Sequence, residues 1–158
     1  MIQLVCQDWK CKEYYLNMDK IKIIESTWKE TKAFGDKEWP FANVEHYGSK
    51  VDYNQKDFIF KATVGGNIVG TIKGNHEAGV IYISYLIVAH DKKGQGIGKL
   101  LTIKAEDFAK KIGAHKVYLQ TGKGWEAEKF YKKLGYKKVA VLLKHHFKKD
   151  FVIYEKFI

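Results

Sequence analysis

Arginine is absent from this 158-residue sequence: all 28 basic side chains are lysine, against 18 acidic ones, which gives a formal net charge of +10 at pH 7. Arginine is the side chain that binds phosphate and guanine in a bidentate way, so its absence argues against a protein that reads nucleic-acid sequence. The positive charge still favours anionic partners, among them a phosphorylated cofactor, nucleic acid or a membrane surface. Because the lysines are spread along the whole chain, we interpret most of them as a solvated surface.

Cysteine and proline are also scarce. Cys6 and Cys11 are the only cysteines, and their spacing matches no zinc motif, so we expect reduced thiols and no metal. Pro40 is the only proline, and no repeat or low-complexity linker divides the chain, which favours a single domain over residues 1–158. No apolar run approaches the roughly 20 residues of a membrane helix, and the N-terminus lacks the features of a secretory signal. We therefore expect a cytoplasmic protein without membrane contact.

Hydrophobic spacing predicts the order of the elements. In the first part we expect a strand at Ile2–Cys6, a helix over Met18–Ala33 and a poorly patterned stretch over residues 36–56. The remaining expectations are strands at Phe58–Val64 and Ile68–Lys73 joined by a turn at Gly65–Asn67, a strand at Val80–Val88, a helix over Ile97–Ile112, a strand at His115–Thr121, a helix over Ala127–Leu134, and strands at Tyr136–Leu143 and Phe151–Phe157. This order predicts an α/β (α+β) fold with a central mixed, mostly antiparallel sheet and helices on both faces.

Three glycines, Gly94, Gly96 and Gly98, stand between the apolar run at Val80–Val88 and the helix that follows. A glycine loop at the start of a helix presents unpaired backbone N–H groups to an anion, and phosphate is the natural guest. The alternative is a tight turn that needs glycine for its backbone geometry alone. The spacing fits neither the Walker loop nor the dinucleotide fingerprint.

Two segments resemble the GNAT superfamily of N-acetyltransferases. The loop Lys93-Gly94-Gln95-Gly96-Ile97-Gly98 is similar to its acetyl-CoA loop, with lysine in place of the usual arginine or glutamine, and "AEKFYKKLGY" at Ala127–Tyr136 is similar to its tyrosine-bearing helix. The resemblance implies a single GNAT-like domain. Within it, residues 1–56 would shape the acceptor site, residues 57–143 would form the acetyl-CoA-binding core and residues 144–158 the terminal strand.

The resemblance also implies roles for individual residues. The diphosphate of acetyl-CoA would lie on Lys93, Gly94, Gln95, Gly96, Ile97, Gly98 and Lys99, and its pantetheine arm would pair with the backbone of Leu86, Ile87 and Val88. Tyr131 takes the position of the catalytic acid, although its spacing alone would also suit a core aromatic residue. The strand Val80–Val88 offers no carboxylate as a base, so either the amine arrives neutral or a water chain accepts its proton. Tyr85 could orient such a water, or it could simply pack.

The resemblance implies an acetyl-CoA-dependent N-acetyltransferase that transfers acetyl directly to a primary amine, with acetyl-CoA as co-substrate and no metal. The acceptor stays open between a small-molecule amine, an aminoglycoside-like polyamine, a peptide N-terminus and a lysine side chain. Aromatic residues between Phe34 and Tyr53, among them Trp39, Phe41 and Tyr47, would suit the wall of an acceptor pocket. The alternative is a non-catalytic module of the same fold that binds nucleic acid through its basic surface. A homodimer is compatible with either reading.

Overall fold

The computed structural model describes residues 14–16 and 21–158. Contacts within the chain divide it into two compact units, Met1–Val51 and Asp52–Ile158. The strand predicted at Ile2–Cys6 and both cysteines lie outside the described residues. None of the helices in the described ranges is long and apolar enough to cross a membrane.

The first unit contains a short antiparallel hairpin and a long helix. Strands β1 (Tyr14–Leu16) and β2 (Ile21–Ile23) pair with each other, and α1 runs over Trp28–Tyr47. A capping box starts α1, because the Thr27 hydroxyl accepts a hydrogen bond from the Glu30 N–H and the Glu30 carboxylate accepts one from the Thr27 N–H. Such reciprocal bonds satisfy two of the backbone donors that a helix start leaves unpaired.

The helix predicted over Met18–Ala33 is therefore wrong at both ends. Ile21–Ile23 forms a strand, which suits its β-branched side chains, and the capping box fixes the helix start five residues beyond that strand. The helix then continues through Pro40, into the stretch over residues 36–56 for which we expected no regular structure, and it ends at Gly48 with a φ of 72°. A proline costs the helix one hydrogen bond, which this 20-residue helix tolerates.

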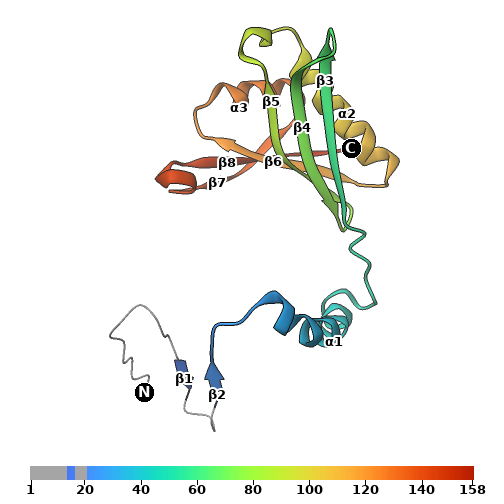
Figure 1. The fold of residues 1–158 in the computed structure, drawn as a ribbon, viewed down its shortest axis with the longest axis vertical. Helices are drawn as coiled ribbons and strands as arrows, with labels where there is room; N and C mark the ends of the chain where they lie inside the picture. The colour runs from blue at the N-terminus through green and yellow to red at the C-terminus, as the bar shows by residue number, and fades with distance from the viewer. Residues whose placement is uncertain (1–13, 17–20) are drawn as a thin grey trace. The chain divides into compact units, whose positions relative to one another are not determined.

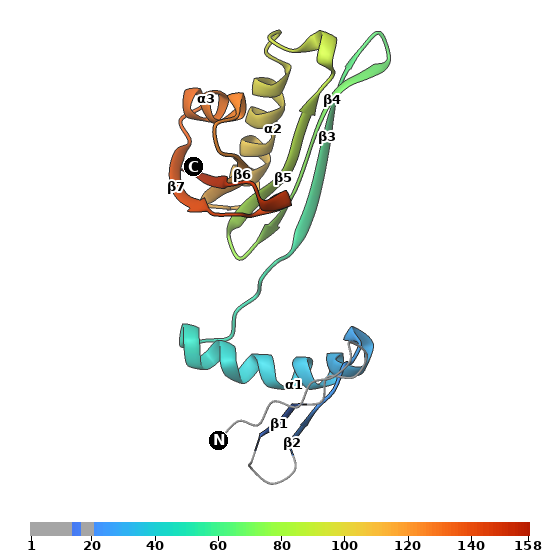
Figure 2. The same cartoon turned by 90° about the vertical axis from the view of Figure 1, so that its left-hand side faces the viewer.

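Six strands of the second unit form one mixed sheet in the order β3-β4-β5-β6-β8-β7 (Figures 1 and 2). Their bounds are Lys56–Val64 for β3, Asn67–Glu77 for β4, Val80–Val88 for β5, Lys116–Gly122 for β6, Lys137–Leu142 for β7 and Phe151–Phe157 for β8. Every neighbouring pair is antiparallel except β5 and β6, which are parallel. The predicted mixed, mostly antiparallel sheet is confirmed, as are the six strands and the turn between β3 and β4.

Two helices of the second unit, α2 (Ile97–Lys111) and α3 (Glu126–Lys133), pack on the same side of this sheet (Figure 2). Both helices contribute to one buried cluster with the central strands; among its members are Leu101, Ala105, Tyr131, Ile81, Ile83, Val117 and Leu119. Their apolar side chains recur at helical spacing on α2 and α3 and alternate on β5 and β6, so the sequence pattern accounts for this core. Both helices are confirmed where the sequence predicts them, but the second unit does not have the expected helices on both faces of the sheet. The connections β5–α2–β6 and β6–α3–β7 run in the same direction along the sheet, so right-handed crossovers place both helices on one face.

Candidate active site

The centre of the candidate site is a gap between β5 and β6. The two strands pair only as far as Ile83 and Leu119, although β5 continues to Val88 and β6 to Gly122. Figure 1 shows the strands diverging beyond that point. Two adjacent strands that part in this way leave backbone groups on both sides of the gap without a ladder partner.

A β-bulge lies where the strands part. Ile83 of β5 pairs with Gly74 of β4, and Tyr85 pairs with the adjacent Lys73, so Ser84 is the extra residue. A bulge bends its strand and increases the local twist, which turns the rest of β5 away from β6. The bulge therefore gives a local cause for the gap.

The far part of β5 presents one free edge to the gap. Its other edge remains paired with β4 as far as Val88. In an antiparallel pair, alternate residues direct their N–H and C=O groups to the outer side, so the backbone over Leu86, Ile87 and Val88 offers both groups to the gap. No strand pairs with that side within the described residues. An extended molecule with amide groups can bind there as an added strand would.

The glycine loop connects β5 to α2. After the short 3₁₀ turn η1 (His90–Lys92), Gly94 and Gly96 adopt φ values of 79° and 83°, a conformation that L side chains rarely adopt. A Cβ on either glycine would point into open space, whereas a Cβ on Gly98 would lie 3.4 Å from the ring of Phe130. The first two glycines are thus needed for the backbone turn, whereas a Cβ on Gly98 would make only an ordinary van der Waals contact with Phe130 of α3.

The N-terminus of α2 lacks the negative charge that normally stabilises a helix start. Its N-cap is Gly96, which offers no side-chain acceptor, and the first turn holds no acidic residue but does hold Lys99. Lys92 lies 3.3 Å from the Asp91 carboxylate, while Lys93 is exposed. Unpaired N–H groups, the positive end of the helix dipole and two lysines together favour a bound anion. In residues 14–16 and 21–158, no group of three His, Cys, Asp or Glu side chains is placed to hold a metal ion.

Tyr131 lies on α3 with its ring 7% exposed. The ring makes edge-to-face contacts with Phe130 and Tyr136, at 5.0 and 5.6 Å between centroids, and lies 6.4 Å from the ring of Tyr154. Tyr154 pairs with Leu119, the residue at which β6 parts from β5. Tyr131 is therefore placed beside the start of the gap, on the side covered by the helices.

Burial changes the acidity of this phenol. It raises the pKa of Tyr131 from 10.0 to about 12. A phenol with its ordinary pKa would match a leaving thiolate more closely, so the buried phenol is a weaker acid than the sequence alone suggests. The raised pKa also means that the hydroxyl keeps its proton throughout the neutral range, which a proton donor requires.

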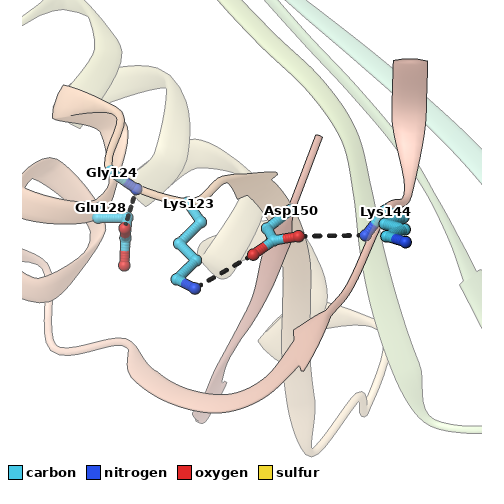
Figure 3. Close-up of polar contacts among 5 residues, drawn as sticks. All are labelled: Lys123, Gly124, Glu128, Lys144 and Asp150. Atoms are coloured by element: carbon cyan, nitrogen blue, oxygen red, sulfur yellow. Dashed lines mark hydrogen bonds and ion pairs between the residues drawn. The ribbon is translucent and has the colours of Figure 1, made fainter. Parts of the chain in front are cut away.

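The start of α3 is held by a carboxylate (Figure 3). Glu128 accepts a hydrogen bond from the N–H of Gly124 at 2.6 Å with one oxygen. Its other oxygen accepts a hydrogen bond from the hydroxyl of Tyr154 at 2.7 Å. These two hydrogen bonds, the backbone one first, lower the pKa of Glu128. They tie the first turn of α3 to β8 and so help to position Tyr131 one turn later. The motif does not mark Glu128 as functional, although a glutamate in the first turn of a helix is a known start signal.

The remaining predicted residues lie apart from Tyr131. Tyr85 sits on β5 just beyond the bulge, 43% exposed, and it pairs with Lys73 on the sheet face away from α2. Trp39, Phe41 and Tyr47, expected in an acceptor pocket, lie on α1 in the first unit and are exposed there. The structure thus brings the loop, the edge of β5 and Tyr131 around one gap, with Tyr85 on its opposite face.

Comparison with known proteins identifies the class. The model of the acetyltransferase (GNAT) family matches residues 21–136. This span is well over half of the chain, so the protein belongs to the acetyltransferase (GNAT) family, and it is an acyltransferase. The resemblance found in the two sequence motifs is confirmed. No curated protein sequence shows a significant match.

Solved structures support the same fold. An acetyltransferase from Bacillus cereus ATCC 14579 superimposes with a TM-score of 0.69 and 22% identity, over 86% of this chain and 96% of that one. PaiA N-acetyltransferase from Thermoplasma acidophilum, in complex with coenzyme A, superimposes with a TM-score of 0.56 and 21% identity, over 83% of this chain and 76% of that one. A GNAT family acetyltransferase from Elizabethkingia anophelis with acetyl-CoA bound superimposes with a TM-score of 0.58 and 17% identity, over 63% of this chain and 75% of that one. At these identities the likeness shows a shared fold alone.

Proposed function

We propose that the protein is an acetyl-CoA-dependent N-acetyltransferase that transfers the acetyl group directly to a primary amine. The observation that carries this proposal is the gap between β5 and β6, which opens at Ile83 and Leu119 with the start of α2 at one end and Tyr131 at the other. Two structural neighbours with the same fold hold acetyl-CoA or coenzyme A. The family match favours this enzyme over the nucleic-acid-binding module.

The cofactor would be held mainly by backbone groups. Its diphosphate would accept hydrogen bonds from N–H groups of the loop Gly94–Lys99, with Lys93 and Lys99 adding positive charge. Its pantetheine amides would pair with the free edge of β5 over Leu86–Val88. A backbone N–H on this edge would then donate to the thioester oxygen as negative charge develops on it.

The transfer is balanced without any further reagent. The nitrogen of the amine forms a bond to the acetyl carbon, and the carbon–sulfur bond breaks with its electron pair leaving on sulfur. The nitrogen loses one proton and the sulfur gains one. Tyr131 would give its proton to the sulfur and recover one that the nitrogen releases, so that no buried phenolate accumulates. Because β5 carries no carboxylate, the proton released by the nitrogen would pass to Tyr131 through water, which the exposed Tyr85 hydroxyl would orient.

A free-thiol assay with a panel of amines tests this function. Wild-type protein should release coenzyme A from acetyl-CoA in an amine-dependent way. Tyr131→Phe should lower kcat about 100-fold or more, as expected for the loss of a general acid, while the Kd for acetyl-CoA changes less than about twofold. Tyr136→Phe is the matched control, since Tyr136 is a buried tyrosine in contact with Tyr131, and it should keep its turnover. Full activity of Tyr131→Phe would remove the role assigned to that residue.

A further inference from the structure

Four rings gather at the end of β6 on the sheet face opposite α2 and α3. We call Trp125, His145, His146 and Phe151 the aromatic wall. The Phe151 ring lies 5.6 Å from that of Trp125, 5.4 Å from that of His145 and 4.8 Å from that of His146, between centroids. The two imidazoles stack on each other at 4.3 Å and 20°. Phe151 is buried beneath the other three, which are exposed.

Strand alternation fixes the side of the sheet on which this wall stands. On β8, Val152 and Tyr154 point into the core beneath the helices, so Phe151 points to the other face. Phe151 pairs with Gly122, and a Cβ on Gly122 would lie only 2.2 Å from the indole of Trp125. The indole therefore lies directly on the backbone of β6, and glycine is the residue that allows this contact.

The aromatic wall borders the gap. Gly122 is the last residue of β6 and follows the parting point at Leu119 by three residues, or about 10 Å of strand. The helix side of the gap is covered by α2 and α3, so an acceptor that reaches the thioester comes from the opposite face. There it meets Tyr85 on the β5 side and the aromatic wall on the β6 side.

Positive charge dominates the turn between β7 and β8, which carries the two imidazoles. Asp150 accepts hydrogen bonds from the Lys123 ammonium and the Lys144 N–H, both at 3.1 Å (Figure 3). These bonds occupy its carboxylate. Lys148 and Lys149 follow His146 in the turn, and no carboxylate among the described residues forms an ion pair with either. The segments that carry the aromatic wall, residues 123–126 and 144–150, hold four lysines against the two carboxylates of Glu126 and Asp150, so a guest there meets an excess of positive charge.

On these grounds we propose that the aromatic wall is the acceptor subsite for an aromatic α-amino acid. The ring of the acceptor stacks on Trp125 and His146, its carboxylate faces Lys148 and Lys149, and its amine points along β6 into the gap. A polycationic acceptor would be repelled by the same lysines. This assignment rests on the proposed acetyltransferase function and adds the class of its amine.

Matched acceptors separate the contributions of the ring and the carboxylate. The free-thiol assay compares L-tryptophan and L-phenylalanine with L-alanine, which lacks the ring, with phenethylamine, which lacks the carboxylate, and with spermidine. We expect kcat/KM for the aromatic amino acids to exceed that for each of the others at least about tenfold. The assignment would be overturned if the aromatic amino acids had a kcat/KM no higher than that of L-alanine and phenethylamine, or if spermidine were the preferred acceptor.

Variants localise the effect. Trp125→Ala and His146→Ala should each lower kcat/KM for L-tryptophan about three- to tenfold, which corresponds to the free energy of one aromatic ring contact. The kcat/KM for L-alanine should change by less than about twofold. Phe147→Ala is the matched control, because this ring lies in the same turn, is 96% exposed and is outside the aromatic wall. His146→Ala keeps the test valid if Trp125→Ala fails to fold. A uniform loss for all acceptors would refute a ring-specific role.

Calorimetric titration with acetyl-CoA distinguishes the two levels of failure. If the protein binds acetyl-CoA and acetylates some amine, but the aromatic wall variants and acceptor series show no ring preference, the acceptor assignment alone is wrong. If acetyl-CoA does not bind and no amine releases thiol, the proposed function is wrong and the acceptor assignment falls with it.

Discussion

Tyr131→Phe should change how the stability of the protein depends on alkaline pH. In the unfolded chain the phenol ionises near its ordinary pKa of 10.0, whereas burial raises the pKa in the folded protein to about 12. Between these values the unfolded state has lost a proton that the folded state still holds. Raising the pH through this window therefore favours unfolding, and the stabilisation is fully present only below about pH 10.

The size of the effect follows from the two pKa values. A difference of about two units corresponds to about 2.7 kcal/mol once both states have ionised, and about 2 kcal/mol of this is lost by about pH 11.5. Urea unfolding of wild type and Tyr131→Phe at about pH 8 and about pH 11.5 measures it. The phenylalanine variant lacks this ionisation, so its free energy of unfolding should fall by about 2 kcal/mol less than that of the wild type.

The comparison between variants removes the titration of the lysines, which both proteins share. Phe130→Leu serves as the control, because it disturbs the packing around Tyr131 without changing an ionisable group. The stability difference between Phe130→Leu and wild type should stay constant over the same pH range. A difference between Tyr131→Phe and wild type that is also constant would refute the burial of the phenol and, with it, the reason for its weak acidity.

Two further predictions concern charged groups. Lys93→Ala should weaken acetyl-CoA binding up to about fivefold at low ionic strength, and this loss of affinity should shrink in high salt, because salt screens the attraction of an exposed lysine. A titration with acetyl-CoA at two salt concentrations measures the loss. A loss that does not depend on salt would contradict this role. Glu106 is 8% exposed, and its carboxylate lies 2.8 Å from the Lys156 ammonium. Glu106→Ala should therefore lower the free energy of unfolding by about 2 kcal/mol. This is less than the loss expected when a fully buried ion pair is broken, because Lys156 is partly exposed. In denaturant unfolding, the double variant with Lys156→Met should recover most of this loss, and no recovery would show that the ion pair is not the cause.

The sequence predicts the elements on the cofactor side of this candidate site well because their signals are local. An apolar run followed by closely spaced glycines predicts both β5 and the backbone turn into α2, and the positive φ values of Gly94 and Gly96 agree with that reading. Apolar side chains at helical spacing likewise predict α2 and α3. These elements depend on residues that lie within one or two turns of each other along the chain.

The gap and the aromatic wall depend on pairing between distant segments. The sequence contains no signal that β5 and β6 stop pairing at Ile83 and Leu119, because both strands continue with similar composition. Trp125, His145 and Phe151 come from three separate segments, and only the register of β8 on β6 brings them together. Adjacent histidines on an extended strand would point to opposite faces, whereas the turn between β7 and β8 stacks them.

The error at α1 has a different origin. The spacing of Ile21, Ile24 and Trp28 fits one face of a helix and so predicts a helix that begins too early. Thr27 and Glu30 form a capping box, a pattern of side chains that can be recognised in the sequence and that sets the helix start more directly than the apolar stripe does.

Binding of acetyl-CoA is the most direct test of the central claim, that the helix start of α2 and the free edge of β5 hold this co-substrate. Isothermal titration of the protein with acetyl-CoA measures it without any assumption about the acceptor. The account predicts saturable binding with one site per chain. The absence of binding at millimolar acetyl-CoA would contradict it.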